Sequence, residues 1–214
     1  MFGKNKLFGF PLIKESDYIE IGGGEGDLSL DLKNRGFNII LFIEPEIKKF
    51  EIASKKLKST LCLNIDAENL NVDQINPKFK TLTVIMQDVI EHISFKSLKV
   101  FFEIISIKYE QIHFIGRTPN LKSPFGLRNS FGDNTHIHRF TDTSLKDFLE
   151  RLDYKNIVVA RENYKITGIV SLLRFPPYFL IILFVSLIYI FVFGTWEGML
   201  TPNIYFYSKK IKHN

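Results

Sequence analysis

The stretch that decides the fold is Tyr18-Ile19-Glu20-Ile21-Gly22-Gly23-Gly24-Glu25-Gly26-Asp27. It begins as a short apolar run, and three of its glycines stand at alternate positions, at Gly22, Gly24 and Gly26. Residues 28–35 have the pattern of a helix. A glycine-rich turn between a strand and a helix N-terminus lets bare backbone approach a ligand. We therefore expect an α/β fold with a binding site at the carboxyl end of this first strand.

Two further strand–turn units follow in the order that a parallel sheet requires. Residues 38–43 form a second apolar run that ends in Glu44, and Glu44 follows Gly26 by 18 residues. An acid at the end of the second strand of such a unit accepts hydrogen bonds from ribose hydroxyls. Residues 60–65 predict a third strand, and Asp66-Ala67 follow it. The spacing favours a nucleoside-containing ligand at this edge.

The fourth predicted strand, residues 82–86, precedes Asp88-Val89-Ile90-Glu91-His92. Together with the motif E-x-G-x-G-x-G, this D-V-I-E-H segment resembles the class I S-adenosylmethionine (SAM) dependent methyltransferases over about residues 18–120. The resemblance implies a Rossmann-like, seven-stranded, mostly parallel sheet that binds SAM. The cofactor-binding residues that it implies are Glu20, Gly22, Gly24, Gly26, Glu44, Asp66, Ala67 and Asp88. The chain departs from the family in its short segment before the first motif and in Leu82, where the family often has Asp.

A long polar segment follows the fifth predicted strand, residues 111–116. Its T-P-N, S-P-F, G-D-x-T-H and F-T elements, between residues 117 and 141, resemble bacterial methyltransferases of cell-surface glycan and lipid-linked sugar biosynthesis. Long loops rich in glycine and proline lie at the surface and often carry function. We expect this loop to hold the methyl acceptor.

Methylation of an alcohol needs a base near its hydroxyl group. His136 and His138 are the candidates, with Asp133 to orient one of them, and Glu91 and His92 could face the acceptor from the other loop. Loop-structuring hydrogen bonds are an equally good interpretation of the two histidines. A zinc site built on His136, His138 and Asp133 has no further spaced His or Cys to complete it, so we predict no metal.

An uncharged apolar run occupies residues 177–193. Its 17 residues reach the lower end of the ~17–25 that span a bilayer. Tyr178, Tyr189 and Trp196 stand near its ends, where amphipathic rings favour a membrane interface. Residues 169–173 extend the apolar character upstream, with an interruption at Arg174 and Pro176-Pro177. We predict that residues 177–193 form a membrane-associating helix. The alternative is a buried core helix, for which a small domain has little interior.

The flanks of this run bear on its orientation. Residues 156–160 and 200–208 are predicted as the sixth and seventh strands, an antiparallel pair in this fold. If both lie in one sheet, the chain must leave and return on the same side, as a re-entrant or interfacial helix does. The alternative is a spanning helix with residues 204–207 outside the sheet. We divide the chain into a methyltransferase core (1–165), a hydrophobic insertion (166–198), and a last strand with a basic tail (199–214).

Composition sets the remaining limits. The 214 residues carry a net charge of +5 with scattered basic residues, so no nucleic-acid partner is expected. The single cysteine, Cys62, excludes an internal disulfide. We predict O-methylation of a membrane-proximal or lipid-linked acceptor, a glycan or polyprenyl-linked sugar, at the cytoplasmic face of a membrane. The alternatives are methylation of a quinone or other lipid, and a non-catalytic SAM-binding or membrane-tethering subunit. The oligomeric state stays open.

Overall fold

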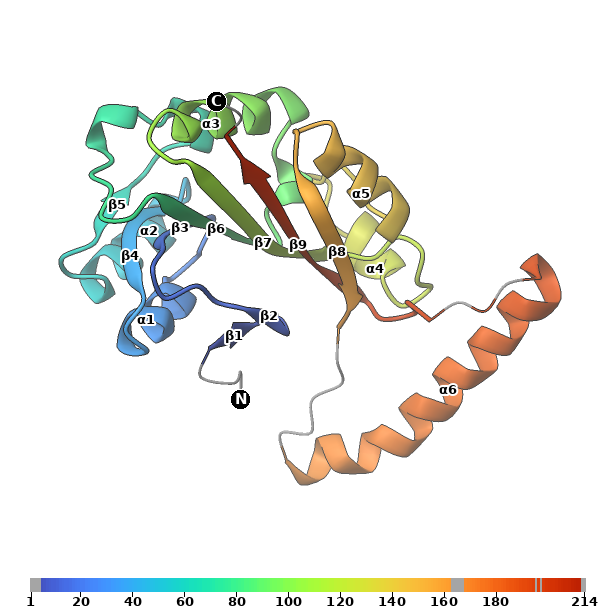
Figure 1. The fold of residues 1–214 in the computed structure, drawn as a ribbon. Helices are drawn as coiled ribbons and strands as arrows, with labels where there is room; N and C mark the ends of the chain where they lie inside the picture. Colours follow the sequence, from blue (N-terminus) through green and yellow to red (C-terminus); the bar gives the residue numbers. More distant parts are fainter. Residues whose placement is uncertain (1–4, 163–167, 195, 197, 213–214) are drawn as a thin grey trace.

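A seven-stranded sheet forms the centre of the molecule in a computed structural model that describes residues 5–162, 168–194, 196 and 198–212 (Figure 1). Its strand order is β5-β4-β3-β6-β7-β9-β8, with β9 antiparallel to both neighbours and the other pairs parallel. The strands are β3 (Asp17–Ile21), β4 (Asn38–Ile43), β5 (Leu61–Leu63), β6 (Thr81–Gln87), β7 (Gln111–Pro119), β8 (Lys155–Arg161) and β9 (Asn203–Ile211). The predicted Rossmann-like, mostly parallel sheet is confirmed.

Helices cover both faces of this sheet. They are α1 (Asp27–Asn34), α2 (Ile47–Lys56), α3 (Phe95–Ser106), α4 (Leu127–Phe131) and α5 (Asp142–Glu150), with α6 (Ile169–Phe193) set to one side. Short 3-10 turns follow β5 and β6, at Ala67–Asn69 and Ile90–His92. Side chains that accept backbone N–H groups begin two helices: Ser94 caps α3, and Thr141 caps α5.

The core lies on the two faces of the sheet because successive strand residues point to opposite sides. In β3, Ile19 packs in the cluster that includes residues of α3 and α5, whereas Tyr18 packs in the cluster that includes Leu32 of α1. An N-terminal hairpin, β1 (Lys6–Leu7) and β2 (Phe10–Pro11), adds to the second cluster. Phe8 lies in the turn of this hairpin, and its ring stacks on the ring of Tyr205 with the two ring centroids 4.6 Å apart.

The fifth predicted strand is longer in the structure than expected. We ended it at Gly116, but β7 continues to Pro119. The reason is β9, which runs antiparallel beside it and pairs Thr118 with Ile204 and Pro119 with Asn203. The start of the predicted acceptor loop is therefore part of the rigid sheet.

The apolar helix also begins earlier than predicted. We expected an interruption at Arg174 and Pro176-Pro177, but α6 begins at Ile169 and runs through both prolines. A proline inside a helix removes one backbone donor and crowds the carbonyl group four residues earlier, yet the residues on both sides of Pro176 and Pro177 are helical. The predicted boundary between residues 165 and 166 lies outside the described residues.

One narrow stripe of α6 packs against the body of the protein. Its half-buried or buried members recur at helical spacing: Tyr178, Ile182, Val185, Ser186 and Tyr189. The hydroxyl of Tyr189 donates to the carbonyl of Lys122 at 2.9 Å. Apart from Ser171 and Arg174, the rest of the helix surface is exposed and apolar, with a mean hydropathy of 2.4 in its most apolar 18-residue window. By length and composition, α6 is the one helix among the described residues that could cross a membrane.

Candidate functional site

The glycine turn lies at the carboxyl ends of β3 and β4. Gly22 has a φ of +62°, and a Cβ atom there would lie 2.5 Å from Cγ2 of Val89. Its N–H donates to the carbonyl of Ile43, the last residue of β4, at 2.8 Å. Only glycine satisfies both the positive φ and the close approach. The turn is thus packed closely between the end of β4 and the loop that follows β6.

Glu44 ties the end of β4 to this turn. Its side chain is buried, and its Oε2 accepts the N–H of Gly24 at 2.8 Å while Oε1 accepts the N–H of Glu46 at 2.9 Å. Hydrogen bonds to an ionised carboxylate are stronger than those between neutral groups. A carboxylate has about four lone-pair sites, so Glu44 keeps acceptor capacity for a ligand hydroxyl.

A cavity of about 740 Å3, here the glycine-turn cavity, opens at this edge. The predicted cofactor residues on its wall are Gly22, Glu44, Asp66, Ala67 and Asp88. His92 and Thr135 line it as well. Five of the eight predicted cofactor residues are therefore brought together around one space, while Glu20, Gly24 and Gly26 lie outside its wall.

Glu20 lies underneath the turn instead of facing the cavity. It is 3% exposed and accepts a hydrogen bond from the hydroxyl of Ser29. A Cβ atom on Gly23 would approach its Cδ to 2.6 Å, so the bare glycine makes room for it. Burial raises the pKa of Glu20 to about 7. In the structure Glu20 supports the turn from below.

Asp88 directly follows β6, at the start of the next loop. Its φ of +54° is uncommon for a residue with a side chain. Its carboxylate accepts the Nε–H of Arg117 at 2.9 Å, and a second nitrogen of the same guanidinium pairs with Oδ2. Sequence reasoning gave Arg117 no role because it fell in a predicted loop. The extension of β7 puts it beside the site, next to Glu162 at 4.0 Å.

A second cavity of about 520 Å3, the loop cavity, adjoins the first, and Asp88 and His92 line both. Its other wall comes from the polar segment after β7, including Arg128, Asp133 and His136. Backbone bonds hold this segment against the fourth-strand loop: the carbonyl of Glu91 accepts the N–H groups of residues 137 and 138, both at 2.9 Å.

Four predicted side chains meet there, and we call them the acid–histidine cluster: Glu91, His92, Asp133 and His136. The rings of His92 and His136 lie 4.5 Å apart. Nε2 of His136 lies 4.0 Å from Oε1 of Glu91 and 4.0 Å from Oδ2 of Asp133. Residues from two segments that are some 40 positions apart in sequence thus converge on one wall of the loop cavity.

Burial is the largest cause of the pKa shifts of Glu91 and His92 in the cluster. Glu91 is 1% exposed, and burial raises its pKa to about 7, so its carboxyl group changes charge near neutral pH. Its Oε2 accepts the hydroxyl of Thr118 at 3.1 Å. Burial, and then the neighbouring His136, lower the pKa of His92. Hydrogen bonds from Thr135 lower the pKa of Asp133.

His138 lies apart from its predicted companion. Its ring packs 5.0 Å from the ring of Phe148 and 5.7 Å from that of Phe140, and burial lowers its pKa. It lines neither of the two cavities described above. The structure therefore separates the two predicted base candidates and leaves His136 in the cluster.

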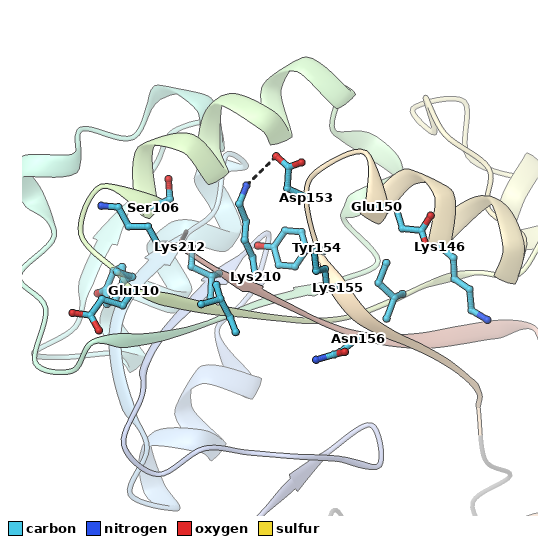
Figure 2. Close-up of a pocket in the computed structure, with 14 residues that line it drawn as sticks. Ser106, Glu110, Lys146, Glu150, Asp153, Tyr154, Lys155, Asn156, Lys210 and Lys212 are labelled. Atoms are coloured by element: carbon cyan, nitrogen blue, oxygen red, sulfur yellow. Dashed lines mark ion pairs between the residues drawn. The ribbon is translucent and has the colours of Figure 1, made fainter. Parts of the chain in front are cut away.

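A larger cavity, of about 850 Å3, lies at the opposite, amino edge of the sheet (Figure 2). Charged side chains of both signs line it, among them Lys146, Lys155, Lys210 and Asp153, and the last two pair at 3.6 Å. None of the predicted site residues lines it. Because ligands of open α/β sheets bind at the carboxyl edge, we place the site at the glycine turn.

Comparisons with known proteins support the fold. No protein-family model and no curated protein matches the sequence. A SAM-dependent methyltransferase from Archaeoglobus fulgidus is 16% identical with a TM-score of 0.61, over 91% of this chain and 86% of that one. One from Clostridium acetobutylicum is 16% identical with a TM-score of 0.55, over 92% and 85%. A complex of a Haloferax volcanii methyltransferase with its Trm112 activator contributes a chain that is 9% identical, with a TM-score of 0.63, over 95% and 86%. The chain has the fold of the SAM-dependent methyltransferases.

Proposed function

We propose that the protein is a SAM-dependent methyltransferase that methylates a hydroxyl group of a membrane-proximal or lipid-linked acceptor. The observation that carries this proposal is the pair of adjoining cavities that share Asp88 and His92. A two-substrate transfer needs both substrates side by side, and positioning contributes much of the rate. The glycine-turn cavity would take the cofactor, and the loop cavity would take the acceptor.

The residues of the glycine-turn cavity fit SAM. Gly22 brings bare backbone to the wall of this cavity, and the carboxylate of Glu44 would accept the ribose hydroxyls. Asp66 and Ala67 line the same cavity at the end of β5, where an acid would meet the adenine amino group. When bound, SAM supplies an electrophilic methyl group whose transfer to oxygen leaves the electron pair of the broken C–S bond on sulfur and releases the hydroxyl proton.

The acid–histidine cluster would receive that proton. Glu91 has a pKa near neutrality, which suits a group that exchanges protons at physiological pH. His92 and His136 bring two imidazoles to the same wall. A cluster of this kind favours a hydroxyl acceptor, because an amine or thiol acceptor needs less help in losing its proton.

An apolar groove of about 490 Å3 supports the membrane-proximal part of the proposal. It lies between α6 and the start of β9, and its wall includes Tyr178, Ile182 and Leu200. Glu162, which also lines it, accepts the Nδ2–H of Asn203 at 2.9 Å, and Asn203 lines the loop cavity. An acceptor with a lipid tail could therefore place its polar end in the loop cavity and its tail along α6.

The connections of α6 favour a helix that lies in the membrane interface. The helix has 25 residues, about 37 Å at ~1.5 Å per residue. It leaves β8 and returns to β9 at one edge of the sheet, the edge of the glycine turn. A spanning helix would force residues 194–202 back through the hydrocarbon core, where a short segment cannot satisfy its backbone groups. We propose that α6 rests on the cytoplasmic face of a membrane.

Transfer of a radiolabelled methyl group tests the proposal. The purified full-length protein in detergent, incubated with [methyl-3H]SAM and a membrane lipid extract, should label a product that partitions into organic solvent. The variant Glu44→Ala should label far less at the same SAM concentration. Label on a quinone would select that acceptor class. SAM binding without transfer to any extract would support the non-catalytic alternative and contradict the proposed activity.

A further inference from the structure

We propose that Glu91, His92 and His136, with Asp133 at the rim, form a binding site for a first-row divalent transition-metal ion. The candidate ligand atoms of the first three residues lie within 4.8 Å of one another. The sequence had suggested only a weaker set built on His136 and His138. The fold replaces His138 with a buried carboxylate and a histidine from the fourth-strand loop.

The hydrogen bonds of His136 fix which of its nitrogens carries a lone pair. Its Nδ1 lies 3.1 Å from the carbonyl oxygen of Ser130, and a carbonyl can only accept. Nδ1 must therefore carry the proton. In the neutral form of the ring the lone pair is then on Nε2, which lies 4.0 Å from a carboxylate oxygen of Glu91 and 4.0 Å from one of Asp133. Metal-ligating histidines show this arrangement, with the second nitrogen donating to a carbonyl or carboxylate.

The tautomer of His92 follows from a second chain of bonds. The hydroxyl of Thr135 donates its single proton to Oδ1 of Asp133 at 2.6 Å. Oγ1 of Thr135 also lies 2.9 Å from Nδ1 of His92. Because its proton is already donated to Asp133, Oγ1 can only accept there, and Nδ1 of His92 carries the proton. Nε2 of His92 is left with the lone pair. Both imidazoles are thus held in the form that binds metal ions.

Glu91 provides the independent sign of a ligand. Its Oε1 is buried and has no hydrogen-bond partner among the residues that the structure describes. A buried polar atom without a partner costs about 1–3 kcal/mol. This oxygen lies 4.0 Å from Nε2 of His136, which is too far for a direct hydrogen bond. A divalent cation between the two atoms would give both of them a partner.

The donor set decides the class of cation. Two imidazole nitrogens and a carboxylate suit Mn2+, Fe2+, Co2+ or Zn2+, whereas Mg2+ and Ca2+ prefer oxygen ligands alone. Ligand bonds of about 2.0–2.2 Å would require the three atoms to close in by small side-chain rotations. His92 and His136 lie on loops, which allow this, and Asp133 could complete the set from the rim.

A catalytic role for the ion rests on the proposed function. The ion would border the loop cavity, whose wall includes all four residues of the cluster. A hydroxyl group bound to a divalent cation loses its proton more readily. Binding of the ion itself requires no methyl transfer, so the two claims can be tested apart.

The test is a titration of the full-length protein in detergent, first stripped with a chelator, with Co2+. We expect one equivalent of Co2+ to produce visible d–d absorption bands and to raise the melting temperature. The variant His136→Ala should weaken Co2+ binding about 10- to 100-fold or more. The variant Glu91→Gln, which keeps the side-chain shape, should do the same. His138→Ala removes a histidine from the same loop but not from the cluster and should respond as the wild type does. Mg2+ should compete poorly.

Circular dichroism and SAM affinity show whether each variant is folded. Loss of Co2+ binding in a folded His136→Ala protein supports the site. No spectral change in the wild type at millimolar Co2+, or the same change in His136→Ala, would overturn it. Methyl transfer that persists in the stripped protein leaves the proposed function standing and refutes the catalytic role of the ion. Co2+ binding without any SAM binding would support the metal site and contradict the proposed function.

Discussion

Membrane attachment through α6 can be tested by placing charges on its exposed side. Sixteen large apolar side chains of this helix are more than a third exposed, and Phe191 is the most exposed at 87%. Burying one such side chain is worth about 1.5–3 kcal/mol. If each of the sixteen side chains contributed only a third of that value, the total would be about 8–16 kcal/mol. This total is comparable to the free energy of unfolding of a whole domain, about 5–15 kcal/mol. A bilayer interface removes this surface from water.

The perturbation is the double variant Phe184→Asp and Phe191→Asp, both on the exposed side. Loss of the transfer of the two phenyl groups into the membrane alone removes about 3–6 kcal/mol, which corresponds to a partition coefficient about 150- to 20,000-fold lower. The assay is flotation with lipid vesicles. Ile107→Asp is the matched control, because Ile107 is 65% exposed but lies at the far end of α3, at the amino edge of the sheet. It should float as the wild type does.

Two results would refute this reasoning. In one, the double variant floats with the vesicles as well as the wild type. In the other, the wild type stays in the aqueous fraction as a detergent-free monomer. Either result would mean that a protein partner or the core, and not a membrane, covers the apolar surface of α6.

Three further predictions concern the site and the turn. Glu44→Ala should weaken SAM binding by about 1–3 kcal/mol, or 5- to 150-fold in Kd by calorimetry, whereas Glu25→Ala on the exposed part of the turn should change it little. His136→Ala should lower kcat about 100-fold or more with SAM affinity kept, and His138→Ala should lower it far less; full activity in the His136 variant would exclude that residue. Because the folded-state pKa of Glu20 is raised to about 7 from 4.5, its contribution to stability is complete below pH 4.5 and is lost as pH rises to 7. Glu20→Gln, which keeps an acceptor for Ser29, should therefore show a smaller fall in melting temperature between pH 5 and pH 8 than the wild type, and an equal fall would contradict the raised pKa.

The sheet could be predicted from sequence because each strand is a short apolar run that ends at a distinctive turn. The glycines after β3 and the acid after β4 fix the order of the first units, and β6 follows with its D-V-I-E-H segment. The hairpin β1–β2 was missed, since two-residue strands carry no periodic signal. The length of β7 was missed because it depends on pairing with β9, which lies more than 80 residues downstream.

Part of the arrangement of the candidate site could be predicted from the sequence. The identities of Glu44 and Asp66 follow from their places after strands, and both line the glycine-turn cavity. The meeting of Glu91 with His136 depends on two backbone bonds from the polar segment to the carbonyl of Glu91, which no spacing encodes. Arg117 was passed over because its partner, Asp88, faces it only once the fourth and fifth strands lie side by side.

Calorimetric titration of the purified protein with SAM tests the central claim most directly. The account predicts saturable binding at one site per chain, displaced by S-adenosylhomocysteine and weakened in the Glu44→Ala variant. NADH should give no heat, because the glycines at positions 22, 24 and 26 do not have the G-x-G-x-x-G spacing of dinucleotide-binding turns. Tight binding of NADH with no binding of SAM would contradict the account.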